Sequence, residues 1–470
     1  MTQTIQKKLN DYAWARWGAM VLIALMMLFA HMFVDVISPL QEIIQKTHGW
    51  TPDVFGSFMG SEYLLNVVGF LIVAGIILDK MGIRFTGELS ATMMFLGACI
   101  KFYAVSDWFA GSAFEEWLNS WWVAMPGSAK LASLGFMIFG CGCEMAGITA
   151  SKALAKWFEG KEMALAMGLE MALARVGVFV IFTISPRLAG IGGLEPSVVK
   201  PVAFCTALLF IGLLCYSIFC VMDKKFDKQL GAEAAQGESE EEFKLADVKN
   251  IFTSKLFWIV AMLCVLYYSA IFPFQKFAAN MLQSNLGLDA TTAADIFRWF
   301  PIGAACITPL LGWFLDKKGK GATMLILGSL LMIICHLTFA LVLPAFPNKF
   351  VAYAAIILLG ISFSLVPASL WPSIPKIMDK RFLGSAYSLI FWVQNFGLSG
   401  TPMIIGWALE KSNPGVAEQI AAGAEGIAYN YTLPMLIFAS LGGLALLFSL
   451  WLKAMDKRNG YGLELPNIKE

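Results

Sequence analysis

The sequence predicts an all-α membrane protein in which twelve transmembrane helices form two pseudo-symmetric bundles of six. The first observation is composition: 58% of the 470 residues are hydrophobic and 14% are charged, whereas a soluble domain is about a quarter charged. The second is a series of twelve apolar runs of about twenty residues, the length that a helix needs to cross a bilayer core. The third is an internal repeat that separates the first six runs from the last six.

The apolar runs follow one another along the chain, and each is expected to be helical because lipid cannot hydrogen-bond an open strand edge. They cover residues 17–39, 55–78, 86–106, 131–154, 163–185, 201–222, 254–281, 292–315, 322–343, 350–371, 383–408 and 431–453. Basic residues such as Lys152, Lys156 and Lys457 collect in alternate loops and near both ends, whereas the intervening loops are acidic, as at Glu115. The positive-inside rule predicts cytoplasmic termini, and we expect a multi-pass protein of a bacterial inner (plasma) membrane.

One polar segment divides the chain. Residues 223–250 hold the acidic run 238–242 and no apolar run, a composition typical of a solvated linker. We therefore expect an N-terminal six-helix bundle over residues 1–222, a cytoplasmic linker over 223–250, and a C-terminal six-helix bundle over 251–470.

The two halves share sequence. The segment GIILDKMGIR, which begins at Gly75, recurs as GWFLDKKG 237 residues later, beginning at Gly312. A second set of matches has an offset of 220 residues and includes Gly177 and Gly397. Parallel six-helix repeats of this kind are typical of transporters that bind their substrate between the two halves.

Two charges of opposite sign lie near the middle of consecutive spans. Glu144 is fourteen residues after Lys130, and Arg175 is fourteen residues after Lys161, so each is about 21 Å along its helix from a flanking lysine. The two lysines are at opposite faces, so both charges are expected near the midplane, where a charge is costly and usually functional.

The chemistry of this pair suits a solute charged at both ends. A guanidinium can bind a carboxylate through two parallel hydrogen bonds, and the Glu144 carboxylate can accept an ammonium group or a proton. A small zwitterion would satisfy both Glu144 and Arg175. The alternative interpretation is a structural salt bridge between the two spans, although burying such a pair often costs as much as it returns.

The repeat also predicts an asymmetric cavity. At the offset of 220 residues Glu144 corresponds to Ser364 and Arg175 to Asn395, so the C-terminal half is neutral at these positions. We expect that half to supply neutral and aromatic walls, and the candidates are Tyr267, Tyr268, Trp371, Trp392, Gln394 and Asn395. For each aromatic residue ordinary helix packing is the alternative.

Four more charges lie within apolar runs. Asp35 and Glu62 are candidates for lining the cavity or carrying a proton, and Asp35 is equally suited to capping a helix end. Lys276 is a candidate for binding a substrate carboxylate; the alternatives are pairing with Glu62 across the two halves or snorkelling to the surface. Lys101 is expected at the membrane interface.

The loop between the second and third spans carries a specific motif. It consists of Gly75, Asp79, Lys80, Gly82 and Arg84. This GxxxD(K/R)xGxR pattern resembles the signature of the major facilitator superfamily, and the resemblance implies that Asp79 and Arg84 help to close a cytoplasmic gate. The echo in the second half keeps Asp316, but it has Lys320 and no arginine after Gly319, which weakens the same inference for Asp316. The alternative is that Lys80 and Arg84 only anchor the topology.

Further segments resemble the dipeptide-transporter branch of that superfamily, which has lysosomal and prokaryotic members. They are DVISPLQ from Asp35, KWFEGKEMALAMG from Lys156, VPASLWP from Val366, and the stretch 384–397. The binding pair of that branch, a Glu in span four and an Arg in span five, would fall on Glu144 and Arg175.

These features predict a secondary transporter that moves a small zwitterionic solute, above all dipeptides, by alternating access between the two halves. The alternatives are an organic-anion carrier, in which Arg175 binds a carboxylate and Glu144 carries a proton, and a membrane sensor or scaffold. We expect a monomer in the lipid bilayer that binds a zwitterion or carboxylate, with protons as a further ligand. The sequence shows no nucleotide-binding, metal or catalytic motif, so no cofactor, enzymatic activity or nucleic-acid partner is expected.

Overall fold

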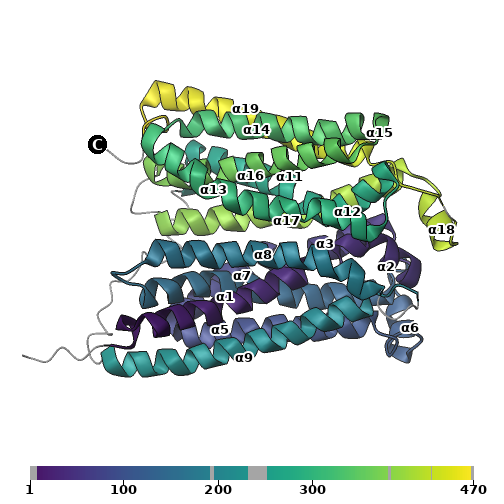
Figure 1. Cartoon of the computed structure of the whole chain (residues 1–470), viewed down its shortest axis with the longest axis horizontal. Coiled ribbons are helices and arrows are strands. Elements are labelled where there is room, and N and C mark those ends of the chain that lie inside the picture. Colours follow the sequence, from purple (N-terminus) through teal and green to yellow (C-terminus); the bar gives the residue numbers. More distant parts are fainter. Residues whose placement is uncertain (1–7, 191–194, 231–250, 379–382, 425, 467–470) are drawn as a thin grey trace, which may run out of the picture.

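The chain folds into two helical bundles that lie side by side with their helices along the long axis of the molecule (Figure 1). This computed structural model describes residues 8–190, 195–230, 251–378, 383–424 and 426–466. The secondary structure of these residues is helical, with turns and short connections between the helices. The architecture confirms the predicted all-α class with two bundles.

The N-terminal bundle contains the helices up to α9. They are α1 (Ala13–Asp35), α2 (Gln41–His48), α3 (Pro52–Ser61), α4 (Leu64–Val67), α5 (Phe70–Val105), α6 (Ala113–Asn119), α7 (Gly127–Trp157), α8 (Met163–Ala189) and α9 (Val199–Leu230), with single turns η1 (Leu9–Asp11) and η2 (Ser38–Leu40). The long helix α5 joins the second and third spans across a kink at Gly82, where φ is 75° and ψ is 174°. A residue with a side chain rarely adopts this positive φ, so the motif glycine makes the turn between these spans possible.

The C-terminal bundle repeats this arrangement. Its helices are α11 (Lys255–Leu286), α12 (Ala290–Phe297), α13 (Trp299–Lys318), α14 (Gly321–Leu337), α15 (Leu343–Ala345), α16 (Lys349–Ile377), α17 (Leu383–Ser412), α18 (Val416–Ala421) and α19 (Thr432–Asn459), and η4 (Thr338–Val342) is a π turn between α14 and α15. Gly319 corresponds to Gly82 in the repeat and also has a positive φ, of 71°. The sequence repeat is therefore a structural repeat.

Twelve spans can be counted in the described residues. Nine helical segments there are long and apolar enough to cross a membrane. The chain from α3 to α5 supplies two more spans, and α17 supplies the last. The number agrees with the prediction. The predicted linker 223–250 begins as helix, because α9 continues to Leu230, and its acidic run 238–242 lies outside the described residues.

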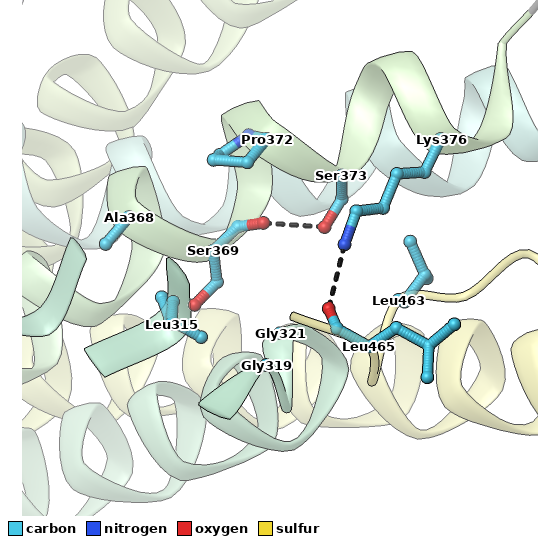
Figure 2. Close-up of a pocket in the computed structure, with 10 residues that line it drawn as sticks. All are labelled: Leu315, Gly319, Gly321, Ala368, Ser369, Pro372, Ser373, Lys376, Leu463 and Leu465. Atoms are coloured by element: carbon cyan, nitrogen blue, oxygen red, sulfur yellow. Dashed lines mark hydrogen bonds between the residues drawn. The ribbon is translucent and has the colours of Figure 1, made fainter. Parts of the chain in front are cut away.

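We call the end of the molecule where α1 begins and α19 ends the proximal end, and the opposite end the distal end (Figure 1). At the proximal end the residues after α19 fold back over the C-terminal bundle and line a small pocket with α16 and the α13–α14 turn (Figure 2). The Lys320 amide donates to the Glu464 carbonyl at 3.0 Å, and the Lys376 ammonium donates to the Leu465 carbonyl at 3.0 Å. The tail thus ties together three elements of this bundle.

The expected interfacial position of Lys101 is wrong. Its side chain is fully buried in the N-terminal bundle. The ammonium lies 4.3 Å from the ring centroids of Phe33 and Phe136 and 5.0 Å from that of Phe58. These rings come from α1, α7 and α3, and their faces stabilise a cation in place of water. The position of Lys101 along its helix could be read from the sequence, but the side of the helix that its ammonium occupies could not.

Candidate functional site

Glu144 on α7 and Arg175 on α8 are both half-buried. Within the described part of the chain neither side chain has a hydrogen bond or an ion pair. The structure therefore does not contain the Glu144–Arg175 salt bridge that was the alternative interpretation. Both charged groups retain free hydrogen-bonding capacity and some access to solvent.

Arg175 contacts the opposite bundle. Its guanidinium carbon Cζ lies 4.7 Å from the centroid of the Phe363 ring on α16. Phe363 belongs to a group that we call the aromatic wall: Tyr268, Phe272, Phe363 and Trp371. The ring centroids of Phe272 and Phe363 are 5.6 Å apart, and those of Tyr268 and Trp371 are 6.4 Å apart. The Trp371 indole N–H donates to the Tyr268 hydroxyl at 3.2 Å, which fixes both rings.

Two of the predicted wall residues, Tyr268 and Trp371, are members of this group, whereas Tyr267 is not. The Tyr267 side chain is 1% exposed and points into the C-terminal bundle, where its hydroxyl contacts the Ser329 hydroxyl at 2.5 Å. Successive residues of a helix point about 100° apart, so adjacent tyrosines cannot both face the same wall. Tyr267 is a packing residue.

The three predicted residues of α17 have different surroundings. Gln394 is buried, and its side-chain oxygen lies 3.1 Å from the Cys264 sulfur. Asn395 donates to the Phe391 carbonyl at 2.8 Å, and its buried Oδ1 has no hydrogen-bond partner among the described residues. The Trp392 indole donates to the Val67 carbonyl of the N-terminal bundle at 2.8 Å. Trp392 therefore joins the two bundles.

Lys276, Asp35 and Glu62 form a buried cluster between the bundles, which we call the charged triad. The Lys276 ammonium lies 3.2 Å from Asp35 Oδ1 and 3.5 Å from Glu62 Oε2, and the three side chains are at most 4% exposed. Asp35 also accepts hydrogen bonds from Gln275 at 2.6 Å and from Ser38 at 3.0 Å. Lys276 thus pairs across the halves instead of snorkelling. In this conformation its ammonium group is paired with the Asp35 and Glu62 carboxylates.

Close packing of α3 against α17 accompanies the triad. A Cβ atom on Gly60 would lie 2.3 Å from the Ser399 carbonyl, and one on Gly56 would lie 2.3 Å from the Pro402 carbonyl. The Ser399 hydroxyl donates to the Gly60 carbonyl at 2.9 Å. Further towards the distal end, Gln45 donates to the Tyr429 hydroxyl at 2.7 Å. The two bundles are therefore in tight contact on the distal side.

A model of the Major Facilitator Superfamily matches residues 23–402, most of the chain. The chain belongs to the major facilitator superfamily. The resemblance seen in its motifs is thereby confirmed, and the protein is a secondary transporter of small molecules and not an enzyme.

Named relatives lie in one branch of the superfamily. Over 352 residues the chain is 28% identical to the lysosomal dipeptide transporter MFSD1 of Danio rerio. This alignment covers 73% of this chain and 70% of the relative. It is 27% identical over 289 residues to the protein of the same name from Homo sapiens, which covers 60% of this chain and 60% of the relative. The resemblance to the dipeptide-transporter branch is thus found over more than half of each chain.

Solved structures share the fold. A bacterial homologue of the human lysosomal transporter Spinster has a TM-score of 0.69 at 14% identity, over 94% of this chain and 98% of that one. The D-xylose–proton symporter has a TM-score of 0.67 at 14% identity, over 92% of this chain and 97% of that one. At this identity the likeness shows the major facilitator fold alone.

The superfamily motif lies at the proximal end of the N-terminal bundle. Lys152 of α7 donates to Asp79 at 2.8 Å. Arg84 donates to Asp223 at 2.8 Å, and Lys156 donates to the same carboxylate at 2.8 Å. Lys80 is exposed, Gly75 is helical within α5, and Asp316 holds the matching place in α13. In this conformation the described ion pairs of the motif connect α5, α7 and α9 within one bundle.

The start of α1 is held at the same end by two exposed ion pairs. Lys161 donates to Asp11 at 2.6 Å, and this hydrogen bond lowers the pKa of the Asp11 carboxyl. Arg16 donates to Glu162 at 3.0 Å and lowers the pKa of that carboxyl. Both pairs join the beginning of α1 to the α7–α8 connection.

Four side chains that contact the charged triad or form the aromatic wall were not among the candidate site residues of the sequence analysis. Gln275 and Ser38 donate hydrogen bonds to Asp35, and Phe272 and Phe363 belong to the aromatic wall. A signal for Phe363 was present, because it precedes Ser364, the repeat counterpart of Glu144. No local pattern distinguishes Gln275 from other polar residues of an apolar span.

Proposed function

We propose that this transporter moves dipeptides or similar small zwitterions by alternating access between its two bundles. The observation that carries the proposal is the state of Glu144 and Arg175: both are half-buried, and neither is paired within the described residues. An unpaired charge at this depth is costly, so the two groups are well explained as the ends of a binding site. The name of the relatives, lysosomal dipeptide transporter, supports the same solute.

In this proposal Arg175 binds the substrate carboxylate through the edge of its guanidinium, and Glu144 accepts hydrogen bonds from the substrate ammonium group. The aromatic wall packs against the substrate side chains, and Trp392, Gln394 and Asn395 of α17 supply neutral groups nearby. Main-chain ends are common to all dipeptides, so this arrangement favours a carrier that tolerates many side chains.

The distal contacts form one gate of the alternating-access cycle. In the structure the charged triad and the α3–α17 packing hold the bundles together at that end. Opening the distal side must separate Lys276 from Asp35 and Glu62. The two carboxylates then become sites at which protons bind, and the motif residues Asp79 and Arg84 act in the gate at the proximal end.

We propose that the proximal end faces the cytoplasm, because Lys and Arg are concentrated in the loops of that end. The distal gate then faces the outside of a bacterial inner membrane, and the transporter acts as a monomer. Labelling of single cysteines introduced at Lys457 and at Glu418 with a membrane-impermeant maleimide, in a background without the native cysteines, tests the orientation. Labelling of intact cells at position 457 would contradict it.

A ligand panel tests the function. Thermal unfolding of the purified protein is followed with dipeptides, free amino acids and dicarboxylates, and we expect stabilisation by dipeptides that have free termini. Glu144→Gln should abolish this stabilisation, because a neutral amide binds an ammonium group poorly. Stabilisation by dicarboxylates alone would instead favour an organic-anion carrier, for which Glu144→Gln should retain binding and lose proton coupling.

A further inference from the structure

The charge of Arg175 is stabilised by the aromatic face of Phe363 in this structure. The guanidinium has no hydrogen bond or ion pair with another described residue, and its Cζ is 4.7 Å from the Phe363 centroid. The face of an aromatic ring is electron-rich and attracts a cation, most strongly where water is excluded. Phe363 therefore partly replaces the solvent that Arg175 loses in the membrane.

A ring leaves the hydrogen-bonding groups of the guanidinium available. The N–H groups of arginine lie in the plane of the guanidinium and point outward from its edge. A carboxylate binds at that edge, whereas a ring contacts the face. A protein carboxylate in place of Phe363 would compete with the substrate for the same N–H groups. The aromatic contact therefore stabilises the guanidinium and leaves its N–H groups available for a carboxylate.

Phe363 is itself firmly held. Its side chain is 2% exposed. The ring packs edge-on against Phe272 at 5.6 Å and against Tyr268 at 6.3 Å, and it contacts Phe300 at 5.9 Å. A residue fixed by three neighbouring rings has little rotamer freedom. Its contact with Arg175 therefore sets where the guanidinium lies relative to the C-terminal bundle.

We propose that Phe363 is a positioning residue that orients Arg175 for a free substrate carboxylate and makes carboxylate recognition depend on the approach of the two bundles. This inference rests on the proposed function, in which Arg175 binds that carboxylate. Arg175 belongs to α8 and Phe363 to α16, so the contact exists only when these helices are close. Carboxylate affinity and the relative position of the bundles are then linked, and each biases the other.

The test compares a dipeptide with its C-terminal amide by calorimetry on the full-length purified protein. Wild type should bind the free acid of dialanine more tightly than the amide. Phe363→Leu keeps an apolar side chain but removes the ring, and we expect it to weaken binding of the free acid about tenfold with little effect on the amide. Phe363→Tyr retains the ring and should keep the preference for the free acid over the amide.

A trifluorinated phenylalanine at position 363 separates positioning from packing. Fluorination withdraws electron density from the ring face while it preserves the ring shape. We expect the preference for the free acid over the amide to fall, without loss of thermal stability. This variant also keeps the inference testable if Phe363→Leu does not fold. Phe300→Leu is the matched control, because Phe300 packs on the same ring and makes no cation–π contact in the described structure.

The outcomes distinguish this inference from the proposed function. If Phe363→Leu and the fluorinated variant keep the wild-type preference for the free acid while Arg175→Gln loses it, Phe363 has no positioning role and the proposed site stands. An equal loss in Phe300→Leu would also overturn the inference, because it would indicate general packing. If Arg175→Gln and Glu144→Gln both bind dialanine like wild type, the proposed function itself fails.

Discussion

Replacing Lys276 by methionine should destabilise the protein by about 3 kcal/mol, because removal of one partner from a buried ion pair leaves an uncompensated charge. The cost falls unequally on the two carboxylates. Asp35 keeps its hydrogen bonds from Gln275 and Ser38, whereas Lys276 is the partner of Glu62 within the described residues. Neutralising Glu62 should therefore restore more stability than neutralising Asp35.

The expected size of the effect follows from chain length. An unfolding entropy of about 2.1 cal/mol/K per residue gives about 1 kcal/mol/K for 470 residues, so Lys276→Met should lower Tm by about 3 °C. Adding Glu62→Gln should recover most of this loss, and adding Asp35→Asn should recover less. Lys46→Met is the control, because the Lys46–Glu42 pair is exposed and such pairs contribute about 0–1 kcal/mol.

Tryptophan fluorescence during thermal unfolding measures these Tm values in one detergent and at one pH. Two results would refute the reasoning. One is a Lys276→Met variant with a Tm within 1 °C of wild type (a threshold of about one third of the expected shift). The other is an Asp35→Asn rescue as large as that by Glu62→Gln, which would show that Glu62 is not the charge left without a partner.

Three other predictions concern single contacts. Gly60→Ala should lower transport in proteoliposomes by about tenfold or more, because its Cβ would lie 2.3 Å from the Ser399 carbonyl at the distal gate. Gly303→Ala is the control and should transport like wild type, because a Cβ atom there would have no neighbouring atom within 4 Å. Gly319→Ala should lower Tm by about 2 °C, because Gly319 has a positive φ and its Cβ would lie 2.3 Å from the Glu464 carbonyl. Gly312→Ala should leave Tm unchanged, and equal Tm values for the two variants would contradict the prediction. Asp223→Asn should lower Tm by about 3 °C, because the fully buried Asp223 carboxylate accepts hydrogen bonds from Arg84 and Lys156. If Asp223→Asn has the Tm of wild type at both low and high salt, these ion pairs contribute nothing to stability.

Local features of the sequence were sufficient for the spans and the repeat. A run of apolar residues determines that a helix crosses the bilayer, whatever its neighbours are. The glycine of the superfamily motif is required by the positive φ at Gly82, and its counterpart Gly319 has the same requirement. These properties belong to short segments, so they could be predicted without knowing how the helices pack.

The residues of the site were predicted less completely, for a physical reason. Depth along a helix is a one-dimensional quantity, and it was enough to single out Glu144, Arg175 and Lys276. The direction in which a side chain points depends on helix rotation, which the neighbouring helices determine. Tyr267 and Tyr268 are adjacent in sequence, yet Tyr267 points into the bundle interior and Tyr268 is part of the aromatic wall.

The sequence by itself determined that this chain is a twelve-helix transporter of the major facilitator superfamily, and it predicted two opposite charges near mid-membrane, because hydrophobic length, glycine positions and repeats are local properties. Only the tertiary structure decided which groups those charges meet. Lys276 meets Asp35 and Glu62, and Arg175 meets the ring of Phe363. These contacts join residues from different helices, and in both cases from different bundles, so helix packing alone brings them together.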